Sequence, residues 1–158
     1  PTSSHALATV AHVIEGCTVI GWEDDRGQHG TFTAVLRREM KTRKDKGVDV
    51  PVKDYALLLS DTSFDFWADI NKRTPRNGEI LYSGLILPGN NRVQYVSGRY
   101  IGEDGDGHWE ADLTSHPGSS GVPVMDADGN VVALNNGSYG GNYGRSLAWM
   151  TPISQVFN

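Results

Sequence analysis

The sequence is organised around one stretch, Pro117-Gly118-Ser119-Ser120-Gly121-Val122-Pro123. Glycine reaches backbone conformations that are closed to other residues, so a turn of this kind presents its serine and directs backbone N–H groups to one point. A developing oxyanion is held at such a point. Serine is a weak nucleophile and needs a histidine base that a carboxylate orients. The stretch therefore has two interpretations, a turn without chemistry or a nucleophilic Ser120, and the second requires a histidine and an acid elsewhere.

The composition is that of a globular chain of modest size. Its 158 residues allow one domain or two small subdomains that share an interface. The formal net charge of −5 argues against a nucleic-acid binder, which usually has a basic balance. No apolar run approaches the roughly 18–20 residues of a membrane span. Cys17 is the single cysteine, so no internal disulfide forms, and a reducing compartment is favoured.

Short apolar runs between glycine and proline turn signals predict an all-β protein. A polar connector that contains proline and glycine, residues 71–78, divides the chain into two halves. The sequence shows no long amphipathic helix. The predicted strands are residues 10–14, 17–22, 31–36, 55–59, 79–87, 92–100, 122–125, 131–134 and 146–150, and residues 135–144 are predicted to form a loop.

Residues 37–46 are strongly basic, with six basic and two acidic side chains. We interpret them as a solvated hairpin loop. The alternative is a patch that binds RNA or an acidic partner. The segment has no aromatic side chain on which a base stacks, so nucleic acid as a partner is not favoured.

His12 and Asp54 are the candidates for the base and its orienting acid. His12 lies in an apolar stretch, and Asp54 directly precedes the apolar run 55–59. Taken alone, such a histidine is a core or capping residue and such an aspartate is a turn residue. The order His12, Asp54, Ser120, with each residue in the local context that its role requires, favours the catalytic interpretation. Ser119 is the rival nucleophile, but only Ser120 has a glycine two residues before it and one after it.

Three motifs resemble those of the chymotrypsin-like (trypsin-fold) serine peptidases. Thr9-Val10-Ala11-His12 is similar to Thr-Ala-Ala-His, and Asp54-Tyr55-Ala56-Leu57-Leu58 is similar to Asp-Ile-Ala-Leu-Leu. Gly118-Ser119-Ser120-Gly121-Val122-Pro123 is similar to Gly-Asp-Ser-Gly-Gly-Pro. The small size, lone cysteine and excised ends most resemble the proteases of positive-strand RNA viruses, notably the sobemovirus-like and astrovirus-like groups.

The resemblance implies an all-β fold of two antiparallel six-stranded barrels with the active site in the cleft between them. Residues 1–72 would form the N-terminal barrel with His12 and Asp54, and residues 73–158 the C-terminal barrel with Ser120 and the specificity pocket. It implies His12 as general base, Asp54 as its orienting carboxylate and Ser120 as nucleophile, with the backbone N–H groups of Gly118 and Ser120 as the oxyanion hole. Only eleven residues precede His12, which raises the alternative that the first barrel lacks a strand.

The specificity pocket departs from the viral pattern. Viral relatives often carry Gly-x-His on the strand that lines the pocket, whereas this chain has Ala133-Leu134-Asn135. Ser115, Asn135 and Asn142 are the candidate substrate-binding polar groups. They favour a polar P1 residue over lysine or arginine, because no carboxylate is evidently placed to pair a cation. The C-terminal Asn158 would suit such a P1 residue.

The implied function is a serine endopeptidase that cleaves a viral polyprotein and uses no metal and no cofactor. The chain begins at Pro1 without a signal-like stretch, so we expect it to be excised from a longer polyprotein, in the host cytoplasm. One alternative is a cellular or bacterial trypsin-fold protease of the heat-shock type. The other is a trypsin-fold interaction module that binds RNA or a partner protein through the basic residues 37–46.

Overall fold

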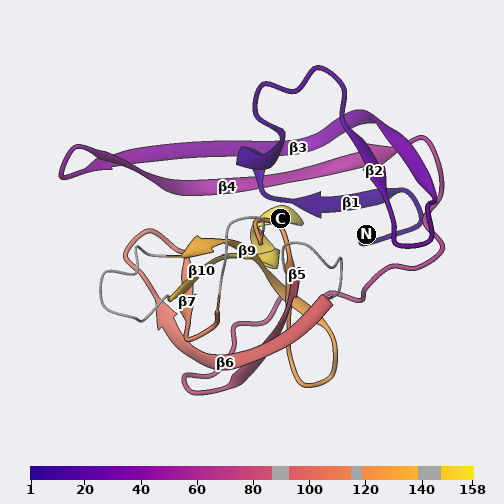
Figure 1. Ribbon diagram of the computed structural model, residues 1–158. Coiled ribbons are helices and arrows are strands. Elements are labelled where there is room, and N and C mark those ends of the chain that lie inside the picture. The colour runs from indigo at the N-terminus through magenta and orange to yellow at the C-terminus, as the bar shows by residue number, and fades with distance from the viewer. Residues whose placement is uncertain (87–92, 115–118, 139–146) are drawn as a thin grey trace.

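The computed structural model describes residues 1–86, 93–114, 119–138 and 147–158 (Figure 1). Its elements are almost all strands, which confirms the predicted all-β class. Within the described ranges, no helix is both long and apolar enough to cross a bilayer. In chain order the elements are β1 (Ala6–Thr9), the 3-10 helix η1 (Ala11–Ile14), β2 (Gly21–Glu23), β3 (His29–Asp45), β4 (Val48–Ser60), β5 (Ile80–Ile86), β6 (Val93–Glu103), β7 (Trp109–Ala111), β8 (Pro123–Met125), β9 (Val131–Ser138), β10 (Ala148–Pro152) and α1 (Ile153–Val156).

The N-terminal sheet is antiparallel and has the strand order β1-β4-β3-β2. Its longest part is the hairpin of β3 and β4, which extends across the upper part of the molecule in Figure 1. At its tip Lys46 and Gly47 have φ angles of 50° and 82°. Two successive positive angles are what a tight two-residue hairpin turn requires.

The basic segment is part of this hairpin and not the predicted loop. Residues 37–45 belong to β3, where Arg37 lies opposite Leu57 and Asp45 opposite Val48. Most of the β3 side chains along this part are exposed, so charged residues suit a strand that is solvated on both faces. Such a strand has no apolar alternation, and a pattern-based prediction therefore misses it.

The C-terminal half forms a closed barrel of six strands in the order β10-β7-β6-β5-β8-β9. Strand β9 continues to Ser138, so residues 135–138 are strand and not the predicted loop. The barrel interior is filled by apolar side chains from all six strands and by Leu113. The buried members are Leu81, Tyr100, Trp109, Ala111, Leu113, Val124, Val132, Ala133, Ala148 and Met150.

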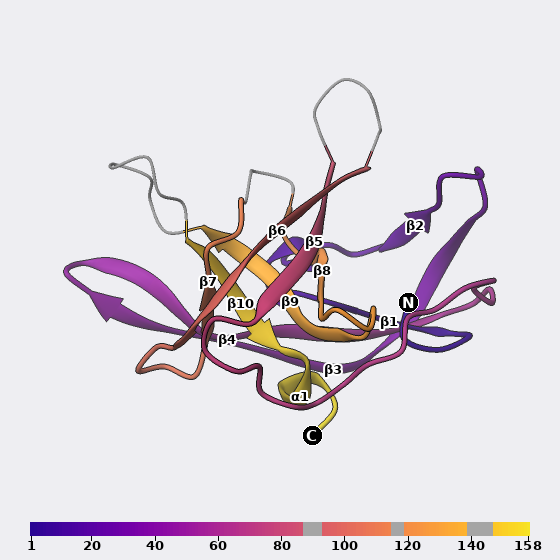
Figure 2. The ribbon, with the colours of Figure 1, turned by 90° about the horizontal axis from the view of Figure 1, so that it is seen from below.

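Strand β4 lies between two hydrophobic cores and contributes side chains to both. Successive side chains of a strand point to opposite faces. Ala56 and Leu58 join Ile14 in the core of the N-terminal sheet. Tyr55 and Leu57 join a second core that reaches the barrel and α1, which Figure 2 shows close to β4. The second core also contains Val10, Val131, Leu134, Ile153 and Val156. This burial on both faces holds the sheet against the barrel and fixes the position of the neighbouring Asp54.

The N-terminal unit differs from a six-stranded barrel, because it is an open sheet of four strands. This agrees with the alternative in which the first barrel is incomplete. The strand predicted for residues 10–14 is wrong. Strand β1 ends at Thr9, and the chain turns into η1 to bury Val10 and Ala11. The boundary near residue 72 stays a prediction, although the sheet ends at Ser60 and the barrel strands begin at Ile80.

Candidate active site

Three side chains from distant parts of the sequence meet between the N-terminal sheet and the barrel. Nδ1 of His12 lies 2.6 Å from Oδ2 of Asp54, and Nε2 of His12 lies 2.9 Å from Oγ of Ser120. His12 is on η1, Asp54 on β4, and Ser120 in the turn before β8. One imidazole therefore joins a carboxylate of the sheet to a hydroxyl that precedes a barrel strand.

Asp54 is almost completely shielded from solvent, with 1 % of its side chain exposed. It lies in the middle of β4 and not at the start of the strand as predicted, because the hairpin extends the strand back to Val48. Its Oδ1 accepts the backbone N–H of His12 at 2.9 Å, and its Oδ2 faces Nδ1 of the same residue. A buried carboxylate requires such hydrogen bonds. Together they fix the imidazole with its protonated Nδ1 toward the acid and Nε2 toward Ser120.

Gly121 shapes the turn that presents Ser120. Its φ is 86°, in the region that favours glycine. Its N–H donates to the carbonyl of Asn135 at 2.7 Å, and a Cβ at this position would lie 2.6 Å from Oγ1 of Thr9. Ser119, the rival nucleophile, is buried, and its carbonyl closes the turn by accepting the N–H of Val122. Ser120 is thus the serine whose hydroxyl reaches His12.

Asn136 and Thr151 also belong to the site, although no sequence motif points to them. The backbone carbonyl of Asn136 lies 3.2 Å from Oγ of Ser120. Oγ1 of Thr151 lies 3.0 Å from the carbonyl oxygen of Asp54 and 2.8 Å from Oδ1 of Asn136. Both residues are buried in strands β9 and β10. The sequence carried no local signal for them, because residue 136 falls in the predicted loop 135–144 and Thr151 falls after the predicted strand 146–150.

Of the predicted pocket residues, only Asn135 lies in the described part of the chain. Its side chain is buried, and its Oδ1 accepts the N–H of Gly137 at 3.0 Å. Ser115 and Asn142, and the oxyanion residue Gly118, lie outside the described residues. The substrate-binding roles of Ser115, Asn135 and Asn142 therefore stay predictions.

A groove of about 850 Å³ adjoins Ser120 between the sheet and the barrel. Two aromatic side chains of the segment that follows β4, Phe66 and Trp67, border it with 70 % and 51 % of their surfaces exposed. Leu7 and Thr9 of β1 also line it, as does Gly121 of the serine turn. Among the described residues, exposed aromatic surface therefore shares a groove with Ser120.

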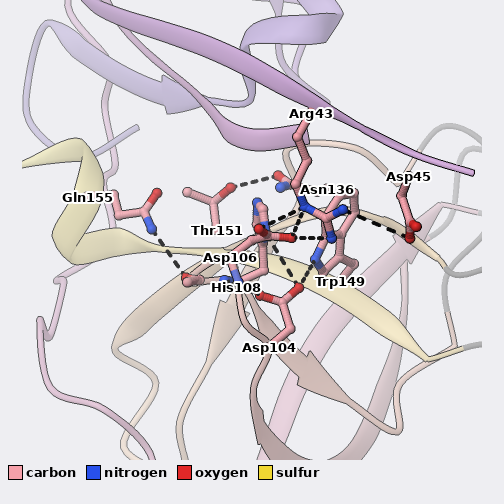
Figure 3. Close-up of polar contacts among 10 residues, drawn as sticks. Arg43, Asp45, Asp104, Asp106, His108, Asn136, Trp149, Thr151 and Gln155 are labelled. Atoms are coloured by element: carbon pink, nitrogen blue, oxygen red, sulfur yellow. Dashed lines mark hydrogen bonds and ion pairs between the residues drawn. The ribbon is translucent and has the colours of Figure 1, made fainter. Parts of the chain in front are cut away.

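Much of the charge of the basic segment is paired within the chain. The guanidinium of Arg43 contacts the carboxylate of Asp106 at 2.7–2.9 Å, joining the hairpin to the turn between β6 and β7 (Figure 3). Lys44 pairs with Asp49 at 2.8 Å, and Lys41 lies 3.4 Å from Glu39. Arg37 donates to the carbonyl of Val156. These contacts leave less free positive charge than the sequence suggested.

No protein-family model matches this chain, and a search of the curated proteins finds no match. Solved structures are similar to it. The HtrA-type protease AlgW with a decapeptide superposes with a TM-score of 0.73 at 19 % identity, over 98 % of this chain and 46 % of that one. The serine endoprotease from Yersinia pestis has a TM-score of 0.70 at 18 % identity, over 96 % of this chain and 51 % of that one. The MamO protease domain from Magnetospirillum magneticum in its apo form has a TM-score of 0.65 at 15 % identity, over 98 % of this chain and 82 % of that one.

The chain spans about half the length of the first two of these proteins. At these levels of identity the likeness shows the fold, which is the chymotrypsin-like fold that the three sequence motifs predicted. The narrower resemblance to viral proteases stays a prediction.

Proposed function

We propose that this chain is a serine endopeptidase in which Ser120 is the nucleophile, His12 the general base and Asp54 the carboxylate that orients it. One observation carries the proposal, the unbroken line of contacts from Asp54 through His12 to Ser120 at 2.6 and 2.9 Å. Both distances lie in the range that a nucleophile, its base and an orienting group require. The fold shared with proteases supports the same class of reaction.

The geometry suits acyl transfer. Oγ of Ser120 attacks the scissile carbonyl carbon while Nε2 of His12 takes the hydroxyl proton. The tetrahedral intermediate collapses when His12 gives that proton to the leaving amine, which leaves an acyl group on Ser120. Water then attacks the ester with the same imidazole as base and releases the acid. Asp54 holds the tautomer throughout and stabilises the imidazolium.

The oxyanion hole of this proposal consists of the backbone N–H groups of Ser120 and Gly118. Both donors rest on the Gly-Ser-Ser-Gly motif, as the family resemblance implies. Fixed donors of this kind act on the charge that develops in the transition state, where each is worth about 10²–10³ in kcat.

For the substrate we propose a viral polyprotein, cleaved in the cytoplasm of a host cell. The motif resemblance and the lone Cys17 support this choice. A protease of the heat-shock type is the second candidate, favoured by the likeness to an HtrA-type protease. A peptide library distinguishes the two, because a polyprotein protease cleaves after one strongly preferred, here polar, P1 residue. A protease that degrades unfolded proteins accepts many.

The interaction-module alternative is less well supported. Arg43 and Lys44, in the most basic part of the hairpin, are paired with acidic residues of this chain. A binding module also has no need for a histidine held between a buried carboxylate and a hydroxyl.

The decisive experiment combines a fluorophosphonate probe with cleavage of the peptide library by the wild type, by Ser120→Ala and by Ser119→Ala. We expect the probe to label Ser120, and we expect Ser120→Ala to lose about 10⁴–10⁶ in rate. Ser119→Ala is the matched control, one residue away in the same turn, and it keeps the label on Ser120. Labelling that persists in Ser120→Ala, or a wild type that neither cleaves nor reacts, would contradict the proposal.

A further inference from the structure

A short polar chain connects the two halves of the site behind the three converging side chains. Thr151 on β10 is completely buried, and Asn136 on β9 is 7 % exposed. Oγ1 of Thr151 lies 3.0 Å from the carbonyl oxygen of Asp54, so it bridges from the barrel to the strand that carries the acid. It also lies 2.8 Å from the amide of Asn136, and Figure 3 shows the two side chains facing each other.

Asn136 reaches the other end of the site through its main chain. Its carbonyl oxygen lies 3.2 Å from Oγ of Ser120. The serine hydroxyl has one proton, which it shares between this carbonyl and Nε2 of His12. One residue therefore touches the proposed nucleophile with its backbone and approaches the proposed acid through Thr151.

One assignment of the Asn136 amide atoms gives both Nδ2 and the Thr151 hydroxyl a partner. Thr151 has a single hydroxyl proton but two oxygen atoms within reach, and Nδ2 of Asn136 is buried without a partner among the described residues. The two ends of a carboxamide differ only in which atom is nitrogen. With Nδ2 toward Thr151, the amide donates to the hydroxyl and the hydroxyl donates to the carbonyl of Asp54.

We propose that Thr151 and Asn136 are positioning residues for this reaction, acting through two hydrogen bonds in series that hold the Asp54 strand in register with Ser120. The inference rests on the proposed function. His12 spans the interface between sheet and barrel, so its two contacts keep their length only while the two units keep their spacing. The Thr151 bond joins the barrel to the backbone of Asp54 across the same interface. A misplacement of about 1 Å at such a site costs on the order of 10² in rate.

The test compares Thr151→Val, which keeps the shape and removes the hydroxyl, with Thr151→Ser, which keeps the hydroxyl. We expect Thr151→Val to lower kcat by about 10–100-fold with KM nearly unchanged, and Thr151→Ser to restore it. Asn136→Leu removes the side-chain amide but keeps the backbone carbonyl at Ser120, and it should lower kcat by the same factor. The double variant should lower kcat no more than either single variant, because the two bonds act in series.

A matched control variant tests whether Thr151 has only a structural role. Ser83 on β5 is also buried, and its hydroxyl lies 3.3 Å from the carbonyl of Pro123 in the barrel. Ser83→Ala should lower the melting temperature while kcat, measured below that temperature, is unchanged. If Thr151→Val behaves like Ser83→Ala, the positioning role is wrong.

A second readout does not need turnover. The proton between Nδ1 of His12 and Oδ2 of Asp54 should give a downfield ¹H NMR resonance that His12→Gln abolishes. We expect Thr151→Val and Asn136→Leu to shift or broaden it, and Thr151→Ser to return it. A resonance unchanged in both variants overturns the inference even if the chain has no protease activity. A wild type that fails to react with the fluorophosphonate overturns the proposed function and leaves this readout valid.

Discussion

Gly121 and Thr9 approach each other so closely that a Cβ on the glycine would lie 2.6 Å from Oγ1 of the threonine. Thr9 ends β1 in the N-terminal sheet, and Gly121 follows Ser120 before β8. The contact therefore sets how near the serine turn comes to the sheet that carries Asp54 and to η1, which follows β1 and carries His12. Glycine is therefore required at position 121 for two reasons, its positive φ and the close approach of Thr9.

Gly121→Ala should destabilise the protein and lower its activity. A φ of 86° costs a non-glycine residue about 1–2 kcal/mol, and the clash with Thr9 adds to it or displaces Ser120. Gly129→Ala is the matched control, because its φ is 80° and nothing lies within 4 Å of the added Cβ. Thermal denaturation and peptide cleavage check both. Equal losses in the two variants would show that the contact with Thr9 is unimportant, and Thr9→Ala should partly rescue Gly121→Ala.

Asp54→Asn should lower kcat by about 10⁴ while the fold is kept, since the amide no longer fixes the imidazole tautomer that leaves Nε2 free to accept the serine proton. The control is Asp49→Asn, on the exposed part of the same strand, where the carboxylate pairs with Lys44. We expect that variant to cleave a short peptide as the wild type does. Steady-state kinetics decide, and a loss of less than about tenfold in Asp54→Asn would remove Asp54 from the mechanism.

Neutralising Arg43 should weaken the attachment of the hairpin to the barrel without affecting chemistry. Arg43→Gln removes the pair with Asp106, which crosses to the β6–β7 turn, whereas Lys44→Gln removes a pair inside the hairpin. We expect the first to lower the melting temperature more than the second. Both should change kcat/KM for a short peptide by less than about threefold. A large loss of cleavage would instead place the hairpin at the active site.

The same pair gives a pH dependence. The guanidinium of Arg43 lowers the pKa of the Asp106 carboxyl below its ordinary value of 3.8. A lowered carboxyl pKa contributes stability that is present above the ordinary value and is lost as the pH falls through the folded value. The free energy of unfolding of Arg43→Gln should therefore fall less than that of the wild type as the pH is lowered below 3.8. Urea denaturation at a series of pH values checks this, and equal slopes would contradict it.

His108 should make the protein less stable below neutral pH. Its ring is fully buried against Trp149, neither nitrogen has a hydrogen bond among the described residues, and Nδ1 lies 3.6 Å from Asp104. Burial lowers the pKa of the imidazole below its ordinary 6.5, although Asp104, Asp106 and Asp54 oppose the shift.

The unfolded chain therefore binds a proton that the folded one does not. The resulting stability is complete above pH 6.5 and is lost as the pH falls below it, by at most about 1.4 kcal/mol per pH unit. His108→Phe should flatten this part of the profile of unfolding free energy against pH. A variant whose slope equals that of the wild type would show that another group is responsible.

The sequence alone determined the fold class and the three side chains that meet. Glycine positions around Ser120, an apolar run after Asp54 and the apolar setting of His12 are local features, and each predicts its own surroundings. The apolar run 55–59 also predicted a strand, and residues 55–58 of it are buried on both faces in the structure. Local patterns of this kind are visible without knowledge of the neighbours.

Only the tertiary structure decided the rest. The basic residues 37–45 form a strand because β4 supplies their backbone partners, and Arg43 finds Asp106 only when the hairpin lies against the barrel. The sequence places Asn136 in a predicted loop and Thr151 just beyond a predicted strand, and only the packed interface brings them beside Ser120 and Asp54. Contacts between residues about 100 positions apart depend on how the two halves are packed together, and no short stretch of sequence encodes that packing.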